Sequence, residues 1–265
     1  MSDSKKTMVR LSCKNKTQSQ NPSAEYVIYG KHAVTAALLN TKRGCKELWI
    51  TQNVMSDLQN TIQLSRIRPN LRTNLVSTRE FAQIFPNSEG SRCIALRVTS
   101  LAQPKLSDLL DTLQNKRSTI ILLDQVNDPQ NLGAVLRTAL AFESDAIIVP
   151  KDNSANDSGT VAKVASGALE LVPLVTVSNL SNAIIQLKEH GFWIIGLDAH
   201  CNADITTLHQ FEKVGLVFGN EGEGMRRLTR DNCDILSKIK ISSKMESLNL
   251  STSVAIALYE RYSKQ

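Results

Sequence analysis

The hydrophobic pattern divides the chain into a short α/β segment and a longer one. In the short segment, apolar spacing predicts helices over 30–40 and 56–67 and strands over 47–51, 75–77 and 94–98. Val34, Ala37 and Leu38 share one face of the first helix. These elements predict a small α/β domain over residues 25–98. A proline and a shift to polar residues after it indicate a linker and a helix over 99–118.

In the longer segment, short apolar runs alternate with amphipathic stretches. The runs predict strands over 119–124, 145–150, 172–177, 192–198, 215–219 and 238–242. The stretches predict helices over 130–143, 157–167, 179–190, 224–230 and 248–262. This alternation is typical of a mostly parallel sheet covered on both faces. We therefore predict an α/β fold, with a second domain over 119–265.

Residues 1–24 differ from the rest because they are mostly polar and cannot bury much apolar surface. They hold five basic residues, Lys5, Lys6, Arg10, Lys14 and Lys16, and one acidic residue, Asp3. This composition predicts a disordered basic tail. The tail either contacts RNA phosphates or is a passive solvated segment. An organellar targeting peptide is a further alternative, although arginines are few.

Composition narrows the partners and the compartment. The net charge of +6 favours a polyanionic partner such as RNA or DNA. No apolar run is long enough to span a bilayer, and the N-terminus lacks the apolar core of a secretory signal. The five cysteines form no CxxC pair, and the four histidines show no metal-ligand spacing. We expect a reduced cytoplasmic protein without a metal site, with an organellar matrix as the alternative.

Chemistry is expected where strands of a parallel sheet end. After the first strand of the second domain, Asn131 lies near a helix start, beside Asp128 and Pro129. Gly133 and Arg137 are four residues apart, so we expect Gly133 to leave open space one turn before the arginine. The alternative is a helix cap followed by an ordinary surface arginine.

A glycine loop follows the strand at 215–219. Its glycines, 219, 222 and 224, do not have the spacing of a dinucleotide fingerprint, and the lysine of a P-loop is absent. Glu221 and Glu223 would repel a phosphate held by backbone amides. The loop therefore favours a positively charged or zwitterionic cofactor. The alternative is a glycine turn with exposed acids.

A third polar group precedes the last helix. Leu250, Val254, Ala257 and Leu258 form its apolar stripe, while Ser247, Asn249 and Ser251 crowd its start. One of these polar residues suffices as the N-cap, so the others are spare hydrogen-bonding groups at a strand end.

Together the three segments carry a resemblance. "NDPQNLGAVLRTA", "FGNEGEGMRRLTR" and "SLNLSTSVAIALYE" resemble motifs 1, 2 and 3 of the SpoU (TrmH-like) class of SPOUT RNA 2′-O-ribose methyltransferases. The N-terminal unit, with "YGKHAVTAALL", is similar to the ribosomal-protein-L30e-like RNA-binding domain of the bacterial 23S rRNA guanosine-2′-O-methyltransferases. The resemblance implies a deep trefoil knot, S-adenosylmethionine held by the knot loops, and a homodimer with the site near its interface. The positive sulfonium of that cofactor would tolerate nearby acids.

The resemblance also implies roles for particular residues. The catalytic candidates are Asn131, Arg137, Glu221, Ser247 and Asn249. The cofactor candidates are Phe218, Gly219, Asn220, Gly222, Ile239, Ile241, Leu248 and Leu250. The RNA-binding candidates are Lys31, His32, Arg226, Arg227 and Arg230, each of which has a plain surface role as its alternative. In the family, the motif 1 arginine is proposed as the base. Because guanidinium groups hold their protons tightly, we hypothesise that Arg137 clamps a phosphate and orients the hydroxyl, and that Glu221 fixes Arg137 or Asn131.

Two departures from the family pattern bear on the target. Residues 91–93 read "SRC" where relatives usually have His-Gln-Gly, and residues 240–246 lack a common proline and glycine. The predicted substrate is a guanosine of 23S rRNA. The alternatives are a tRNA ribose and a non-catalytic role in RNA binding or ribosome assembly. A nucleotide-dependent oxidoreductase fails on the glycine spacing.

Overall fold

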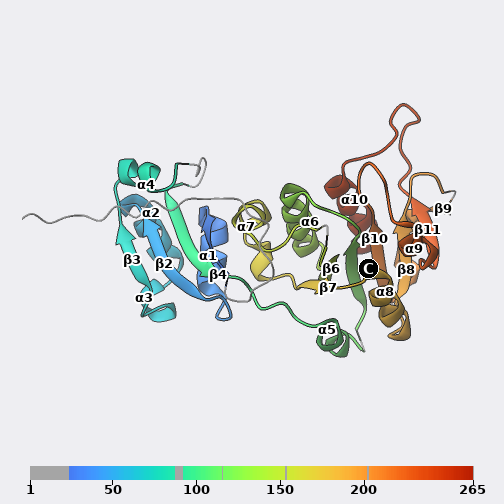
Figure 1. The fold of residues 1–265 in the computed structure, drawn as a ribbon, viewed down its shortest axis with the longest axis horizontal. Coiled ribbons are helices and arrows are strands. Elements are labelled where there is room, and N and C mark those ends of the chain that lie inside the picture. Colours follow the sequence, from blue (N-terminus) through green and yellow to red (C-terminus); the bar gives the residue numbers. More distant parts are fainter. Residues whose placement is uncertain (1–23, 87–91, 115, 153, 202, 265) are drawn as a thin grey trace, which may run out of the picture.

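The structure is a computed structural model that describes residues 24–86, 92–114, 116–152, 154–201 and 203–264. Almost all of the predicted basic tail therefore lies outside the described residues. Two sheets lie at opposite ends of the elongated chain, and helices α6 (Pro129–Ala141) and α7 (Gly159–Ala165) lie between them (Figure 1).

The N-terminal sheet has four strands in the order β1-β4-β2-β3. Strand β4 pairs antiparallel with both β1 and β2, while β3 is parallel to β2. Its elements are β1 (Glu25–Tyr29), α1 (Lys31–Leu39), β2 (Cys45–Ile50), α2 (Gln52–Thr61), α3 (Leu64–Ile67), β3 (Arg72–Leu75), α4 (Thr78–Ile84) and β4 (Ile94–Thr99). The small N-terminal α/β domain is confirmed, and its resemblance to the L30e fold stays a prediction.

The C-terminal sheet has seven strands in the order β7-β6-β5-β10-β8-β11-β9, and every described neighbouring pair is parallel. This confirms the predicted parallel α/β sheet. The elements are α5 (Leu106–Thr112), β5 (Ser118–Leu123), α6, β6 (Ala146–Pro150), α7, η1 (Ala168–Glu170), β7 (Leu174–Val177), α8 (Leu180–Glu189), β8 (Trp193–Leu197), β9 (Ala203–Asp204), η2 (Ile205–Gln210), β10 (Lys213–Phe218), α9 (Arg227–Asp231), β11 (Ile235–Lys238) and α10 (Leu250–Tyr262). The trefoil knot stays a prediction, because strand order and pairing do not establish how the chain threads.

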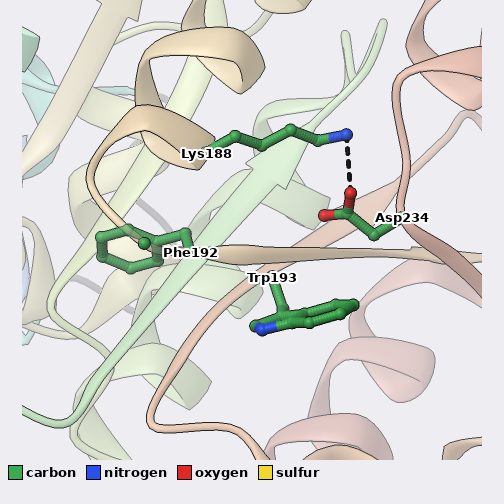
Figure 2. A pocket seen from close by; sticks show the side chains of 5 residues that line it. Lys188, Phe192, Trp193 and Asp234 are labelled. Carbon is green, nitrogen blue, oxygen red and sulfur yellow. Dashed lines mark ion pairs between the residues drawn. The ribbon is translucent and has the colours of Figure 1, made fainter.

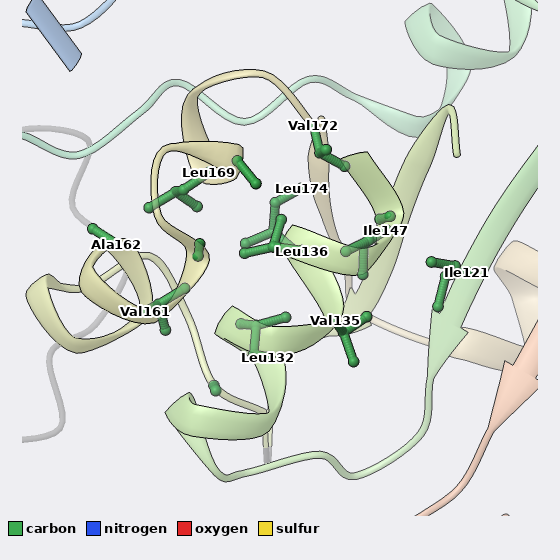
Figure 3. Close-up of a cluster of buried hydrophobic side chains, with 14 of the residues drawn as sticks. Ile121, Leu132, Val135, Leu136, Ile147, Val161, Ala162, Leu169, Val172 and Leu174 are labelled. Carbon is green, nitrogen blue, oxygen red and sulfur yellow. The ribbon is translucent and has the colours of Figure 1, made fainter. Parts of the chain in front are cut away.

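Strand β5 shows why the apolar runs lack polar positions. Ile121 and Leu123 pack against α6, α7 and α10, whereas Ile120 and Leu122 pack against α5 and α8 on the other face. Since successive side chains point to opposite faces and both faces are buried, the four positions from Ile120 to Leu123 are all apolar. Figure 3 shows the first of these clusters, in which Leu132 and Leu136 of α6 lie beside Val161 of α7.

Several predicted elements differ from the structure. The strand predicted over 238–242 is wrong, because β11 ends at Lys238 where its pairing with β8 and β9 stops. The helix predicted over 56–67 is two helices, separated where Ile62 takes an extended conformation. Strand β1 and helix α4 were not predicted, although Ser77 and Glu80 form a capping box at the start of α4.

The two domains share a buried polar network. Arg43, which is 1% exposed, lies between α1 and β2 and forms ion pairs with Glu170 at 2.6 Å and Asp157 at 3.3 Å. Both carboxylates belong to the C-terminal domain. Burial alone would lower the pKa of Arg43, but its hydrogen bonds to Glu170 and the neighbouring negative charges raise that pKa above its ordinary value.

A second buried arginine holds the end of the last helix. Arg261 donates to the carbonyl oxygens of Leu208, Phe211, Glu212 and Ser118 and to the Thr119 hydroxyl, over 2.6–3.3 Å. Burial, with the charge of Arg117, lowers the pKa of Arg261 to about 10. The C-terminal turn of α10 is therefore fixed to the amino ends of β5 and β10.

Removing one charge from the interdomain network should cost much of the protein's stability. We expect Glu170→Ala to lower the free energy of unfolding by about 3–5 kcal/mol, because Arg43 would remain buried without its main partner. Lys116→Met removes a pair with a largely exposed lysine and should cost less than about 1 kcal/mol. Urea unfolding measures both, and equal losses would contradict a buried role for Glu170.

Candidate active site

Three loops leave the C-terminal sheet at one edge, at the carboxyl ends of β5, β10 and β11. They cover residues 124–128, 219–226 and 239–249. In open parallel sheets, ligands bind outside this edge. All three segments singled out in the sequence therefore begin at one place.

The first loop ends in a capped helix. The Asp128 side chain accepts a hydrogen bond from the Gln130 amide at 2.9 Å, and Pro129 occupies the first turn of α6. Asp128 thus satisfies the helix end. Asn131, in the first turn of α6, is therefore not needed as the cap. Its side-chain amide is left for another partner.

That partner is Glu221 of the glycine loop. One carboxylate oxygen, Oε1, accepts hydrogen bonds from Asn131 Nδ2 at 3.0 Å, Asn249 Nδ2 at 2.8 Å and the Leu250 amide at 3.0 Å. Asn249 also donates to Asn131 Oδ1 at 3.3 Å. Residues 90 and 28 positions apart in the chain thus meet at one oxygen.

Asn249 joins this cluster to the last helix. Its side-chain oxygen accepts from the Ser251 amide at 2.9 Å and from the Ser251 hydroxyl at 2.6 Å, so it caps α10 while its Nδ2 reaches Glu221. Of the three polar residues expected to crowd this helix start, Asn249 is the cap.

The glycine loop is a tight turn in which the backbone crosses close to itself. A Cβ at Gly219 would lie 2.1–2.4 Å from the backbone of Gly224 and Met225. Asn220 and Gly224 exchange two backbone hydrogen bonds, and the Gly222 amide donates to Asn220 Oδ1 at 2.9 Å. Gly224 has a φ of +71°, which favours glycine. The glycines therefore bring Glu221 back over the sheet edge.

A buried carboxylate that the sequence analysis missed fastens this loop. Asp124, fully buried at the end of β5, accepts from the Arg226 amide at 2.9 Å and from Arg226 Nε at 2.7 Å. Next to it, Gln125 has a φ of +60°, and its carbonyl accepts from Asn220 at 3.2 Å. The signal in the sequence was a lone acid directly after the apolar run of residues 120–123.

Two catalytic candidates lie outside the hydrogen-bonded cluster. Arg137 is exposed on α6, and among the described residues it has no hydrogen bond or ion pair. Ser247 is exposed in the loop before α10. The expectation for Gly133 is wrong, because Gly133 is buried and a Cβ there would lie 2.6 Å from Val164 Cβ. Gly133 lets α6 approach α7 and does not open space beside Arg137.

The cofactor candidates line the same edge. Phe218 and Leu250 are buried, while Gly219, Asn220, Ile239, Ile241 and Leu248 are partly exposed and Gly222 is exposed. Since Ile239 and Ile241 follow β11 without pairing, their half-buried side chains lie in an irregular loop. The loops thus combine partly exposed apolar side chains, irregular backbone and two exposed acids, Glu221 and Glu223.

Some of the RNA-binding candidates are held in ion pairs, and others are largely exposed. Arg226 is held by Asp124, Arg230 pairs with Asp198 at 3.0 Å, and Lys31 pairs with Asp57 at 3.4 Å. Arg227 is 93% exposed in its side chain and pairs with Asp231 at 3.6 Å, and His32 is exposed. The cation of Arg226 is therefore already occupied by Asp124.

A separate pocket lies at the amino ends of the strands, on the opposite side of the C-terminal sheet from the three loops. It is lined by Lys188, Gly191, Phe192, Trp193 and Asp234, with an ion pair of 2.8 Å between Lys188 and Asp234 (Figure 2). Trp193 is the first residue of β8, so this pocket lies at an amino end and is distant from the three loops. Within the described residues no cluster of three or more His, Cys, Asp or Glu side chains could hold a metal, and no helix could cross a membrane.

Comparison with known proteins decides the family. A model of the SpoU rRNA Methylase family matches residues 118–259, which is more than half of the chain. The chain belongs to the SpoU family. A second model, RNA 2′-O ribose methyltransferase substrate binding, matches residues 27–104 of this SpoU protein.

Relatives of this SpoU protein match over nearly the whole chain. The 23S rRNA (guanosine-2′-O-)-methyltransferase RlmB of Neisseria meningitidis is 37% identical over 88% of this chain and 93% of its own. The putative TrmH family tRNA/rRNA methyltransferase YacO of Bacillus subtilis is 32% identical over 91% of this chain and 96% of its own.

Solved structures share the fold. The SpoU methyltransferase AviRb from Streptomyces viridochromogenes, in complex with the cofactor AdoMet, matches with a TM-score of 0.74. The match covers 91% of this chain and 90% of that one at 19% identity. The predicted SpoU identity and its parallel-sheet fold are thus confirmed, whereas the roles of individual residues stay predictions.

The two described residues of the departure at 91–93 in this SpoU protein have an unusual backbone conformation. Arg92 and Cys93 have φ values of +50° and +53°, in the left-handed region that favours glycine, and Ser91 lies outside the described residues. The chain therefore adopts left-handed backbone at two successive residues that are not glycine.

The shared carboxylate oxygen of Glu221 gives a direct test of the cluster. We expect Glu221→Ala to lower the free energy of unfolding by roughly 1–3 kcal/mol and to speed hydrogen exchange at the Leu250 amide, because three donors lose their acceptor. Glu223→Ala, in the same loop and also exposed, should change stability by less than about 0.5 kcal/mol. Equal effects of the two variants would show that the cluster does not order the loops.

Proposed function

We propose that this protein transfers a methyl group from S-adenosylmethionine to a ribose 2′-hydroxyl in RNA, at a guanosine of 23S rRNA. The observation that carries the proposal is the meeting of Asn131, Glu221 and Asn249 at the carboxyl edge of a SpoU-family sheet. The relatives named as guanosine-2′-O-methyltransferases support 23S rRNA as the target. The cytoplasm, where bacterial rRNA is made, is the proposed compartment.

The three loops have the chemistry that S-adenosylmethionine requires. Ile239, Ile241 and Leu248 are partly exposed and offer apolar surface for an adenine, while Phe218 and Leu250 are buried at the same edge. Glu221 and Glu223 bring negative charge to an edge where a sulfonium, unlike a phosphate chain, is favoured. When bound, the cofactor supplies an electrophilic methyl group.

The protein must then activate a poor nucleophile, because a ribose hydroxyl keeps its proton at neutral pH. Arg137 is exposed and lacks a partner among the described residues, so its guanidinium is free to bind an RNA phosphate bidentately. We assign it to clamping the phosphate beside the target ribose and orienting the 2′-hydroxyl, which would pass its proton to solvent water as its oxygen is methylated.

Glu221 acts through its neighbours. Because its oxygen accepts from Asn131 and Asn249, it orients both amide groups, and of the two residues it was expected to fix, Asn131 is the one in contact. Asn131 Oδ1 accepts from Asn249 at 3.3 Å and keeps a second lone pair, so this oxygen and the exposed Ser247 hydroxyl are the groups proposed to position the ribose.

RNA contacts in the proposal come from both domains. Arg227 and Arg230 follow the glycine loop, and Lys31 and His32 begin α1 of the N-terminal domain. Arg226 is assigned to holding the loop through Asp124, with its partly exposed side chain at the edge of the RNA surface. Single-stranded or loop RNA with an accessible ribose fits such a surface.

A homodimer is part of the proposal. Ile256, Tyr259 and Tyr262 of α10 and Leu140 of α6 are exposed apolar side chains on adjacent helices, and Phe142 packs edge-on against Tyr259. Such a patch favours association with a second copy. Light scattering of the intact protein in solution tests this state.

The substrate is tested by mapping 2′-O-methylation in rRNA and tRNA from cells with and without the protein. We expect one guanosine of 23S rRNA to lose its methyl group when the protein is absent. Loss at a tRNA nucleotide would favour the tRNA alternative. Absence of any change, with no heat of cofactor binding by calorimetry, would favour the non-catalytic alternative.

The role of Arg137 is tested by its pH–rate profile. We expect Arg137→Lys and Arg137→Ala each to lower the methylation rate roughly 10- to 100-fold, because a charge-assisted bidentate contact is lost. The apparent pKa of the reaction should stay unchanged in both. If the lysine variant keeps nearly the full rate and moves the apparent pKa, Arg137 is the base.

A further inference from the structure

We propose that the interface between the two domains sets which ribose is methylated, by fixing the distance between RNA held on the N-terminal domain and the candidate active site. This inference rests on the proposed function. It goes beyond it by assigning a positioning role to Arg43, Asp157, Glu170 and Gly159, none of which lies in the three loops.

The first observation is that every nitrogen of the Arg43 guanidinium donates hydrogen bonds. Its Nε donates to both oxygens of Glu170, its Nη2 donates to Glu170 Oε1 at 2.6 Å, and its Nη1 donates to Tyr26 and the Thr99 carbonyl at 2.9 Å and to Asp157 at 3.3 Å. A buried guanidinium so fully engaged has one arrangement that satisfies it. The domains therefore have one favoured relative position.

The carboxylates of Asp157 and Glu170 also accept hydrogen bonds from residues other than Arg43. Asp157 accepts from the Tyr26 hydroxyl and from the Leu101 amide at 2.9 Å, and Glu170 accepts from Asn40 at 2.7 Å. Leu101 lies at the start of the linker, so the linker is attached to the C-terminal domain where it leaves β4. Separation of the domains would leave an arginine and two acids without these partners.

The second observation is how closely the backbones approach. A Cβ at Gly159, the first residue of α7, would lie 2.4 Å from the Val27 carbonyl oxygen of β1. A Cβ at Gly167 would lie 3.0 Å from Ala36 Cβ of α1. These contacts occur at two points along the interface, which fixes orientation as well as distance.

The third observation is a continuous apolar core. Ile28 and Val34 of the N-terminal domain belong to the same buried cluster as Val161 and Leu136 of the C-terminal domain. In Figure 1, α7 lies directly between the N-terminal sheet and α6. Burial across the boundary makes the two domains one packed body and not two linked ones.

Two helices, α7 and α6, connect the N-terminal domain to the candidate site. Helix α7 contacts β1 on one side and α6 on the other, where Gly133 lies against Val164. Gly133 is two residues after Asn131 and four before Arg137. If the N-terminal domain is displaced relative to α6, the RNA bound to that domain shifts relative to Arg137 and to the Glu221 cluster.

The experiment uses the full-length protein and two ways of opening the interface. Gly159→Val places a side chain against the Val27 carbonyl, and the double variant Arg43→Met with Glu170→Gln removes the network's central ion pair. Lys116→Met, which removes the ion pair with Asp145 away from the interface, is the control. Small-angle X-ray scattering reports the domain arrangement, and calorimetry reports S-adenosylmethionine binding.

We expect both opening variants to increase the radius of gyration and to bind S-adenosylmethionine within about twofold of wild type. Their kcat/KM at the natural nucleotide of intact rRNA should fall roughly 100-fold, since misplacement of about 1 Å costs that much, and methyl groups should appear on neighbouring riboses. On a short RNA that reaches only the C-terminal domain, their kcat should equal that of wild type. The control should match wild type throughout.

Two results would overturn the inference. One is unchanged kcat/KM at the natural nucleotide in a variant whose radius of gyration has increased. The other is wild-type scattering that a single domain arrangement does not fit, which would show that the interface is not fixed. If wild type methylates no RNA, the proposed function fails, while the scattering still reports on the interface.

Discussion

One carboxylate oxygen organises the candidate active site. Glu221 Oε1 accepts three N–H groups, and these belong to the starts of two helices that are far apart in sequence. A charged acceptor is the strongest single group that can join such donors, and its loss would release three loops at once. The parallel sheet makes this possible because it delivers the ends of β5, β10 and β11 to one edge. The glycines of the loop, and Asp124 beneath it, then bring Glu221 into reach of its donors.

The two domains extend this organisation beyond the sheet. The N-terminal domain matches a family of RNA substrate-binding domains, and it packs on α7, which packs on α6. The buried Arg43 network gives the boundary a polar specificity that an apolar contact alone lacks, because only one docking position satisfies every hydrogen bond. A protein that must choose one ribose among thousands gains from a fixed geometry of this kind.

The sequence predicted the parallel sheet, most of its helices and the three segments of the site, because apolar periodicity and strand-end polarity are local signals. The resemblance to the SpoU motifs led us to expect that Glu221 would hold Arg137 or Asn131, and the contact made is with Asn131. What failed depended on tertiary packing. Ile239 and Ile241 alternate with polar residues as a strand does, yet no partner strand extends past Lys238. Gly133 was expected to leave space, but α7 fills it. Arg43, Asp157 and Glu170 gave no local signal, because their pairing joins residues more than 100 positions apart.

Helix α10 runs from the carboxyl ends of the strands of the C-terminal sheet to their amino ends. It starts at Asn249, beside Glu221, and its last turn holds Arg261 inside a ring of four carbonyl oxygens at the amino ends of β5 and β10. Without that guanidinium the four carbonyl dipoles would face one another with no donor between them. Loss of the final helical turn, by truncation or proteolysis, would therefore loosen the cap at Asn249 from the far end of the molecule.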